Sequence, residues 1–261
     1  WSNPGEKGGT LIALDKSVNR LDDDADGYVD DVHGINAVLG TGDPFDDHGH
    51  GTHVGGIIGA AGNNGVGVVG VAWRVRLMAC KSFDARGEGA VSDAIACIDY
   101  ARSHGAKIIN ASWGSPAFES RGLRDAIESA RRAGILFVTS AGNSAQNNDL
   151  NPSYPASYDL DNIVAVAATD RTDQLAFFSN FGAASVDLGA PGYVIFSTWN
   201  TTDSDYRYLN GTSMAAGYVS GAAAVLWAQY PGESHQQIKD RLLSSADSLP
   251  SLAGKTVAGG R

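Results

Sequence analysis

The sequence lacks any apolar run close to the roughly 20 residues that a membrane-spanning helix needs, and only two of its 261 residues are cysteine. The first absence argues against a membrane protein, and the second against a fold held by a disulfide framework. Cys80 ends an apolar run and Cys97 lies in a helix-like stretch, so we interpret both as buried thiols, with a single disulfide as the alternative. No signal peptide is present, so we expect a mature protein or a fragment.

The chain also lacks an excess of positive charge. Its 19 Lys and Arg residues face 29 Asp and Glu residues, which gives a net charge of −10. This balance argues against nucleic acid and anionic membranes as partners and favours bound cations. We expect a monomer.

Short apolar runs of strand length alternate with helical patterns along the whole chain. This alternation predicts an α/β fold, a three-layer α/β/α sandwich around a central, mostly parallel sheet. No linker interrupts the pattern, so we expect one domain over residues 1–261, with 1–31 as an irregular excursion. The expected strands are 34–39, 75–81, 107–112, 135–140, 163–168 and 185–188, and the expected helices are 50–60, 92–103, 122–133, 213–229 and 234–246.

The hexapeptide NGTSMA at 210–215 opens a long segment of small and apolar residues. A polar turn that leads into a buried helix places the hydroxyl of Ser213 at a helix amino terminus, where backbone N–H groups and the helix dipole favour negative charge. Such a position suits a nucleophile whose reaction creates an oxyanion. The alternative for a serine in this place is an ordinary helix cap.

Three histidines lie close together in the segment DDHGHGTH at 46–53. His50 follows a glycine at the start of a predicted helix, where its ring can project into a cleft and act as a general base. A zinc site made by His48, His50 and His53 is the alternative, which the spacing of the three and the lack of a nearby cysteine disfavour.

A third segment, TSAGN at 139–143, follows an apolar strand. Asn143 is either a turn residue or the donor of a side-chain amide to an oxyanion. The three segments together, in the order His, Asn, Ser, resemble the motifs of the subtilisin-like serine protease family, the subtilases. Segments 87–89, 111–114, 154–156 and 190–192 are similar to that family as well, so the resemblance covers nearly the whole chain.

The resemblance implies a secreted serine endopeptidase with a subtilisin-like fold. Ser213 would attack the peptide carbonyl, His50 would take its proton, and Asn143 with the Ser213 N–H would hold the oxyanion. An extended peptide would bind along the chain as an added strand, with large apolar side chains in the main specificity pocket. The residues expected to contact it are Gly87, Glu88, Gly89, Ser112, Trp113, Gly114, Ser140, Ala141 and Gly142.

The acidic segment DDDADGYVDD at 22–31 contains the D-x-D-x-D-G start of a calcium loop. Carboxylates at alternate positions before a glycine are the ligands that calcium prefers, and loops of this kind occur in some subtilases. We therefore expect calcium as a cofactor, although a solvated acidic loop is the alternative. The expected ligands are Asp22, Asp24, Asp26, the Tyr28 carbonyl and Asp31.

The sequence departs from the family pattern at the aspartate that orients the general base. Asp15 ends an apolar run, but Lys16 and Ser17 replace the turn that normally follows, and the segment also resembles the excursion that comes after the family's aspartate. The residue is therefore Asp15 or one that precedes Trp1 in a longer chain. If no such aspartate exists, the protein is a catalytically impaired or silent subtilase fold that binds peptides. A second departure is Gly217, where proline is usual, which predicts a looser helix start.

Overall fold

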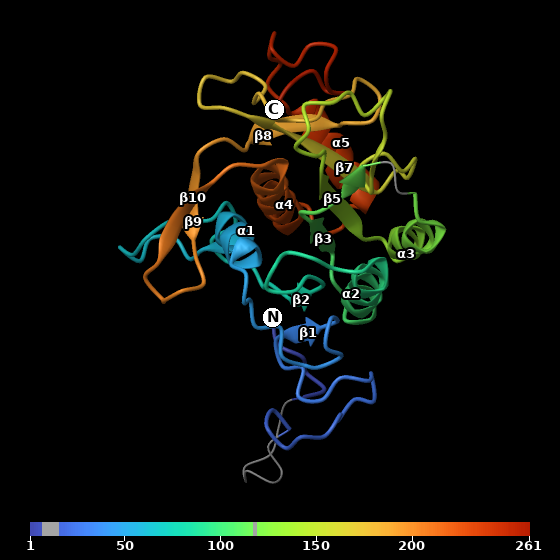
Figure 1. Ribbon diagram of the computed structural model, residues 1–261, viewed down its shortest axis with the longest axis vertical. Coiled ribbons are helices and arrows are strands. Elements are labelled where there is room, and N and C mark those ends of the chain that lie inside the picture. Colours follow the sequence, from blue (N-terminus) through green and yellow to red (C-terminus); the bar gives the residue numbers. More distant parts are fainter. Residues whose placement is uncertain (7–15, 117–118) are drawn as a thin grey trace. The chain divides into compact units, whose positions relative to one another are not determined.

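The computed structural model describes residues 1–6, 16–116 and 119–261, and it divides the chain into two compact units. One unit comprises Trp1–His48 and Arg76–Ala106, and the other comprises Gly49–Val75 and Lys107–Arg261. Figure 1 shows the helices and strands of both. Asp15 lies outside the described residues.

The first unit contains two short strands and one helix. β1 (Gly34–Asn36) pairs in parallel with β2 (Ala79–Lys81), and α2 (Val91–Ser103) follows in the chain. The side chains of Ile35, Cys97 and Tyr100 form the buried centre of this unit, and Cys80 packs against them. Both cysteines are free thiols, and Cys97 is buried as expected, whereas Cys80 is only half-buried. The described residues before β1 form turns and bends.

The second unit is built on a four-stranded parallel sheet in the order β3-β5-β7-β8. Its central strands β5 (Leu136–Ser140) and β7 (Ile163–Thr169) are buried along their whole length, as is usual for parallel strands covered on both faces. The outer strands are β3 (Ile108–Ala111) and β8 (Leu188–Pro191). The parallel sheet predicted from the alternation of elements is therefore confirmed.

Helices cover both faces of this sheet. Leu136 and Val138 of β5 belong to a hydrophobic cluster with residues of α4 (Thr212–Gln229) and α5 (His235–Ser244). Because side chains alternate along a strand, Phe137 faces the other side. α3 (Arg121–Arg132) also packs against β5, and its buried residues lie outside that cluster. Every helix of the second unit begins within one residue of its predicted start.

Two strand pairs are absent from the sequence prediction. β4 (Ser115–Pro116) pairs with β6 (Ser153–Tyr154), and β9 (Ile195–Thr198) forms an antiparallel hairpin with β10 (Tyr206–Leu209). Figure 1 shows this hairpin in orange. In β9 the polar Ser197 is buried and the apolar Phe196 is 44% exposed. A strand is identified in a sequence by apolar residues on its buried face, so β9 has the opposite pattern.

The last strand of the sheet is shifted from its predicted position. β8 begins at Leu188, whereas the apolar pattern predicted a strand over 185–188. The carboxylate of Asp149 accepts hydrogen bonds from the N–H groups of Ala184 and Ser185 and from the Ser185 hydroxyl. These bonds hold residues 184–185 in a turn, and the strand therefore begins later in the sequence, at Leu188. None of the helices in the described part of the chain has the length and apolar character of a membrane span.

Candidate active site and acidic cation site

Ser213 lies in the first turn of α4, after Gly211 and Thr212. The residue that caps this helix is Gly211, and the Ser213 hydroxyl donates to the Ser112 carbonyl at 3.1 Å. Ser213 is 8% exposed. The hydroxyl therefore has no capping role, and it lies beside the free N–H groups at the amino end of a buried helix.

A chain of hydrogen bonds connects the start of α4 to the end of β3. The Ser112 hydroxyl donates to the Ser213 carbonyl at 2.8 Å, and it accepts from the Asn110 amide at 2.8 Å. The Asn110 side-chain oxygen in turn accepts from the Ser220 hydroxyl at 2.8 Å. Two turns of α4 are thus tied to one strand end, which restricts the movement of the Ser213 backbone.

Asn143 follows β5 and is held against the same helix start. Its side-chain oxygen accepts from the N–H and the hydroxyl of Thr212, both at 2.9 Å. The Thr212 hydroxyl accepts in turn from the Gly142 N–H at 3.1 Å. With the oxygen occupied, the Asn143 amide nitrogen is left to donate, and a Cβ added at Gly211 would lie 3.6 Å from it. Asn143 is exposed, so this donor is accessible to a ligand.

His50 is the first residue of α1 (His50–Gly59), and its side chain is half-buried. The preceding Gly49 has a φ of 100°, a conformation that favours glycine. A Cβ at Gly49 would also lie 2.5 Å from the Trp199 ring. The turn that starts α1 at His50 therefore requires glycine for two independent reasons.

α1 packs against α4 at two glycines that are one helical turn apart. A Cβ at Gly217 would lie 3.3 Å from Ile57 Cγ2 and 3.4 Å from Val54 Cγ1. A Cβ at Gly221 would lie 3.2 Å from the carbonyl oxygen of Ile58. The later glycine of α4, Gly221, thus meets a later residue of α1 than Gly217 does. This order indicates that α1 and α4 run in the same direction. Gly217, which the sequence marked as a departure from the family pattern, thus lies in the contact between the two helices.

His53 lies one turn into α1 and is fully buried. Its Nε2 lies 3.2 Å from the carbonyl oxygen of Ile195 and 3.0 Å from that of Arg207, so Nε2 carries the hydrogen and donates to β9 and β10. Its Nδ1 has no hydrogen-bond partner among the described residues. Burial lowers the pKa of this imidazole. His53 therefore fastens α1 to the hairpin, and its Nε2 is not available to a metal.

The residues expected to line one side of a peptide site lie together in the second unit. The Ser140 hydroxyl lies 3.5 Å from the Trp113 carbonyl. A Cβ at Gly114 would lie 3.0 Å from the Tyr154 carbonyl oxygen, and one at Gly142 would lie 2.5 Å from the Asn180 amide nitrogen. Both glycines permit close approaches of backbone that a side chain would prevent.

Gly87, Glu88 and Gly89, also expected to contact a peptide, belong to the first unit. They lie in an exposed turn. The Asp84 N–H donates to the Glu88 carbonyl at 2.8 Å, and the Asp84 carboxylate accepts from the Glu88 N–H at 3.0 Å. The bonds that this carboxylate accepts from the N–H groups of Glu88 and Arg86 lower the pKa of Asp84.

The five expected calcium ligands are arranged in two ways. Asp22 accepts from the N–H groups of Asp26 and Gly27 at 3.2 and 2.9 Å, and Asp26 Oδ1 accepts from the Tyr28 N–H at 2.9 Å. These bonds shape the loop. Asp24 and Asp31 instead converge, and the Asn3 amide donates to both of them at 2.9 and 2.8 Å.

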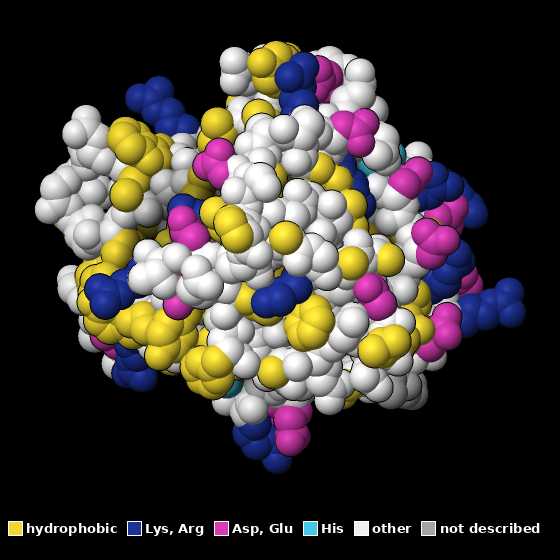
Figure 2. Space-filling view, turned by 90° about the horizontal axis from the view of Figure 1, so that it is seen from above, with side chains coloured by type: hydrophobic (Ala, Val, Ile, Leu, Met, Phe, Trp, Pro, Cys, Tyr) yellow, Lys and Arg dark blue, Asp and Glu magenta, His cyan; other side chains and the backbone are white. Residues whose placement is uncertain are grey.

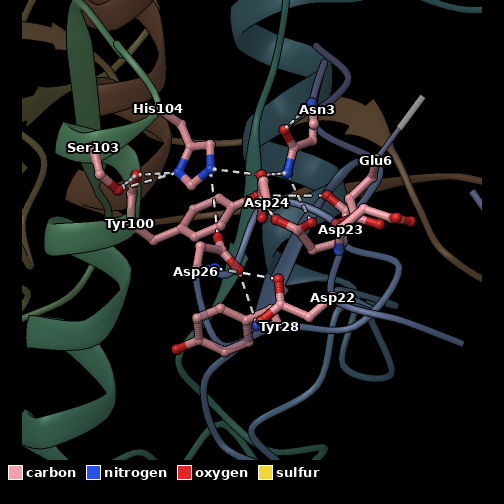
Figure 3. Close-up of polar contacts among 12 residues, drawn as sticks. Asn3, Glu6, Asp22, Asp23, Asp24, Asp26, Tyr28, Tyr100, Ser103 and His104 are labelled. Atoms are coloured by element: carbon pink, nitrogen blue, oxygen red, sulfur yellow. Dashed lines mark hydrogen bonds and ion pairs between the residues drawn. The ribbon is translucent and has the colours of Figure 1, made fainter. Parts of the chain in front are cut away.

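Two further residues, which the sequence gave no reason to select, complete this acidic site (Figure 3). Glu6 is fully buried and offers a carboxylate oxygen within 4.8 Å of oxygens of Asp24 and Asp31. Burial is the main cause that raises the pKa of Glu6, and the neighbouring aspartates add to it. His104 follows α2 and approaches the carboxylates of Asp24 and Asp26. Glu6 is 16 residues from the acidic run and His104 is 73 residues beyond it, so only the fold could reveal them.

Comparison with known proteins identifies relatives over almost the whole chain. Residues 10–259 match the family described as the subtilase family, Peptidase S8. Subtilisin-like protease 1 of Plasmodium vivax is 39% identical over 257 residues, which cover 92% of this chain and 40% of that protein. Subtilisin DY of Bacillus licheniformis is 40% identical over 219 residues, which cover 84% of this chain and 77% of that protein.

Solved structures agree with this match. The crystal structure of a cold adapted subtilisin-like serine proteinase superposes with a TM-score of 0.77 at 31% identity, covering 88% of this chain and 79% of that one. The α/β architecture is therefore the subtilisin-like fold. The chain spans less than half of the length of the Plasmodium proteins, 40% and 46% in two of them.

Proposed function

Because this chain belongs to the subtilase family, we propose that it is a serine endopeptidase whose nucleophile is Ser213 and whose general base is His50. The observation that carries this assignment is the register of α1 against α4. Val54 of α1 packs at Gly217 of α4, and residues four positions apart share a helix face. One turn back along both helices, which run in the same direction, are His50 and Ser213.

In this mechanism His50 takes the proton from the Ser213 hydroxyl as its oxygen attacks the peptide carbonyl. The oxyanion that forms would accept hydrogen bonds from the Ser213 N–H and from the Asn143 amide nitrogen. The bonds from Thr212 to the Asn143 oxygen support this role, because they fix which end of the amide faces outward. His50 would then give its proton to the leaving amine.

The substrate would be a protein or peptide in an extended conformation. Exposed backbone at Gly114, next to the edge strands β4 and β6, supports pairing with an added strand. Ser112, Trp113, Ser140, Ala141 and Gly142 would border the main specificity pocket, with large apolar side chains preferred. Gly87, Glu88 and Gly89 are proposed as further contacts through the family resemblance alone.

There are two candidates for the carboxylate that orients His50. One is Asp15, and the other is a residue that precedes Trp1 in a longer chain. An Asp15→Asn substitution in the active protein separates them. A fall in kcat on the order of 10⁴-fold, the size of this effect in a serine protease of another fold, assigns the role to Asp15. An unchanged kcat assigns it to the other residue.

We also propose that calcium binds the acidic loop through ligands among Asp22, Asp24, Asp26, the Tyr28 carbonyl and Asp31. The convergence of Asp24 and Asp31 supports this, since uncompensated carboxylates repel one another. We propose a secreted monomer, because calcium sites serve many proteins outside cells, where calcium is abundant, and the family resemblance implies secretion. On the face drawn in Figure 2, Lys and Arg side chains stand singly or beside Asp and Glu, which suits a protein substrate better than nucleic acid.

Hydrolysis of a chromogenic peptide by the purified chain tests the proposal. We expect Ser213→Ala and His50→Ala each to abolish measurable kcat, whereas Ser244→Ala, an exposed serine on α5, should leave kcat unchanged. Equal activity of the wild-type chain and Ser213→Ala would refute the assignment.

A further inference from the structure

A buried carboxylate, that of Glu6, lies beside the acidic loop. No positively charged group among the described residues balances its charge. Glu6 has an exposed fraction of 0%. Its Oε1 accepts from the Asp23 N–H at 2.8 Å, and its Oε2 has no hydrogen-bond partner among the described residues. Asp24 and Asp31 lie within ligand distance of the same carboxylate. A buried carboxylate that faces two others needs a proton or a cation.

A second unsatisfied oxygen lies on the other side of Asp24. Asp26 Oδ2 is inaccessible to solvent and has no hydrogen-bond donor in the described part of the chain. It lies 3.4 Å from His104 Nε2, and Asp24 Oδ2 lies 3.8 Å from the same nitrogen. Figure 3 shows the imidazole edge directed toward both carboxylates.

The opposite edge of His104 is already fixed. Its Nδ1 lies 3.0 Å from the Tyr100 carbonyl oxygen, so Nδ1 donates there, and the ring stacks on Tyr100 with centroids 4.1 Å apart. In the neutral imidazole this arrangement leaves a lone pair on Nε2, aimed at Asp24 and Asp26. Histidines that bind metals are commonly oriented by a bond from the other ring nitrogen to a carbonyl group.

We propose that the acidic loop holds two divalent cations side by side, one bound by Glu6, Asp24 and Asp31 and the other by Asp24, Asp26 and His104. The proposal rests on the calcium binding proposed above and extends it to a two-cation centre that shares Asp24.

The donor atoms give the two positions different chemistry. The Glu6 position offers only carboxylate oxygens and suits calcium. The His104 position adds an imidazole nitrogen, which suits zinc and similar transition metals. Two ligands of a tetrahedral metal with bonds of about 2.0–2.1 Å lie about 3.3–3.5 Å apart. The Asp26–His104 separation of 3.4 Å falls in this range, and the Asp24–His104 separation of 3.8 Å is close to it.

The rival explanation is an ion pair in which a protonated His104 bonds to Asp24 and Asp26 without a metal. Calorimetric titration at pH 8, where an unperturbed imidazole is neutral, separates the two. The full-length chain carrying Ser213→Ala, which prevents self-digestion, is titrated with calcium chloride. The calcium-saturated protein is then titrated with cobalt(II) chloride as a spectroscopic substitute for zinc.

We expect one calcium and one cobalt per chain, with visible absorption bands of cobalt bound to nitrogen and oxygen. His104→Gln should weaken cobalt binding at least 100-fold and leave calcium binding unchanged. Glu6→Gln should weaken calcium binding at least tenfold and leave cobalt binding unchanged. His235→Gln is the matched control, because His235 also lies 3.8 Å from a carboxylate, that of Asp161, but near only one.

Calcium binding without cobalt binding in the parent protein would overturn the two-cation centre and leave the calcium proposal intact. Cobalt binding that persists in His104→Gln would overturn it as well. If calcium itself fails to bind while cobalt binding depends on His104, the proposed calcium function is wrong and the His104 position stands alone. A cooperative thermal unfolding transition in the absence of added metal shows that a variant is folded.

Discussion

Val54 Cγ1 on α1 lies 3.4 Å from the point where a Cβ on Gly217 of α4 would be. This contact fixes the separation of the two helices that begin with His50 and carry Ser213. A glycine at this place lets the helices approach closely, and the spacing between the proposed general base and the proposed nucleophile depends on that approach.

A Gly217→Ala substitution should therefore reduce activity without unfolding the protein. Alanine favours the helix by about 1 kcal/mol, but its methyl group would push Val54 and Ile57 away by a few tenths of an ångström. Misplacement by 1 Å can cost about 100-fold, so we expect kcat to fall roughly three- to tenfold with KM unchanged. Gly232→Ala is the control, since an added Cβ there meets nothing within 4 Å. Equal kcat values for both variants would contradict the role of this contact.

Two substitutions at Asn143 separate its proposed catalytic role from its structural one. Asn143→Leu removes both the amide donor and the oxygen that accepts from Thr212, whereas Asn143→Asp keeps the oxygen and removes the donor. Both should lower kcat by about 10²–10³-fold, the usual effect of losing an oxyanion donor. Only Asn143→Leu should also lose about 1 kcal/mol of unfolding free energy. A kcat that survives in Asn143→Asp would show that the amide nitrogen is not used.

His53 should make the protein less stable in weak acid. Burial lowers its pKa in the folded state below the ordinary value of 6.5, so the unfolded chain binds a proton first as the pH falls. Its contribution to stability is therefore complete above pH 6.5 and decreases below it, by at most about 1.4 kcal/mol per pH unit.

Urea unfolding of Ser213→Ala between pH 7.5 and 5 measures this loss, and NMR of the His53 ring should show a titration midpoint below the ordinary value of 6.5. The carboxyl groups of Asp149 and Asp170, whose pKa values are lowered by hydrogen bonds, lose their contribution at a lower pH. The prediction fails if His53 titrates with an ordinary pKa.

Calcium removal should lower the melting temperature. At a calcium concentration of about 100 times Kd, binding contributes about 2.7 kcal/mol, which corresponds to a rise in Tm of roughly 5–10 °C for a chain of this size. Thermal melts with calcium and with EGTA measure the difference, and Asp24→Asn should reduce it. Asp203→Asn, in an exposed loop, should not. Identical midpoints with and without EGTA would contradict calcium binding.

Much of the fold could be predicted because the helices and central strands have regular apolar patterns. α3 buries Leu123, Ala126, Ile127 and Ala130 on one face, so its sequence alone indicates an amphipathic helix. The shift of β8 could not be predicted, because it depends on Asp149, which is distant in sequence. The β9–β10 hairpin was missed for a related reason, since Ser197 is buried only where its hydroxyl donates to the His53 carbonyl at 2.8 Å.

The candidate site was predictable where its chemistry lies in short motifs. Ser213, His50 and Asn143 each lie in a recognisable short motif, and the acidic run indicates the loop that is proposed to bind calcium. Glu6 and His104 have no such signal, because a single glutamate near a turn or a histidine after a helix is ordinary. Their importance arises from burial and from distant partners, which only the folded chain brings together.

Labelling with phenylmethylsulfonyl fluoride tests the central claim most directly. The Ser213 oxygen should displace fluoride from the reagent, so that intact-mass measurement finds one sulfonyl group per chain and peptide mapping places it on Ser213. His50→Ala should suppress the labelling because it removes the base that accepts the proton. No label on Ser213 in the folded wild-type chain, or equal labelling in His50→Ala, would contradict the account.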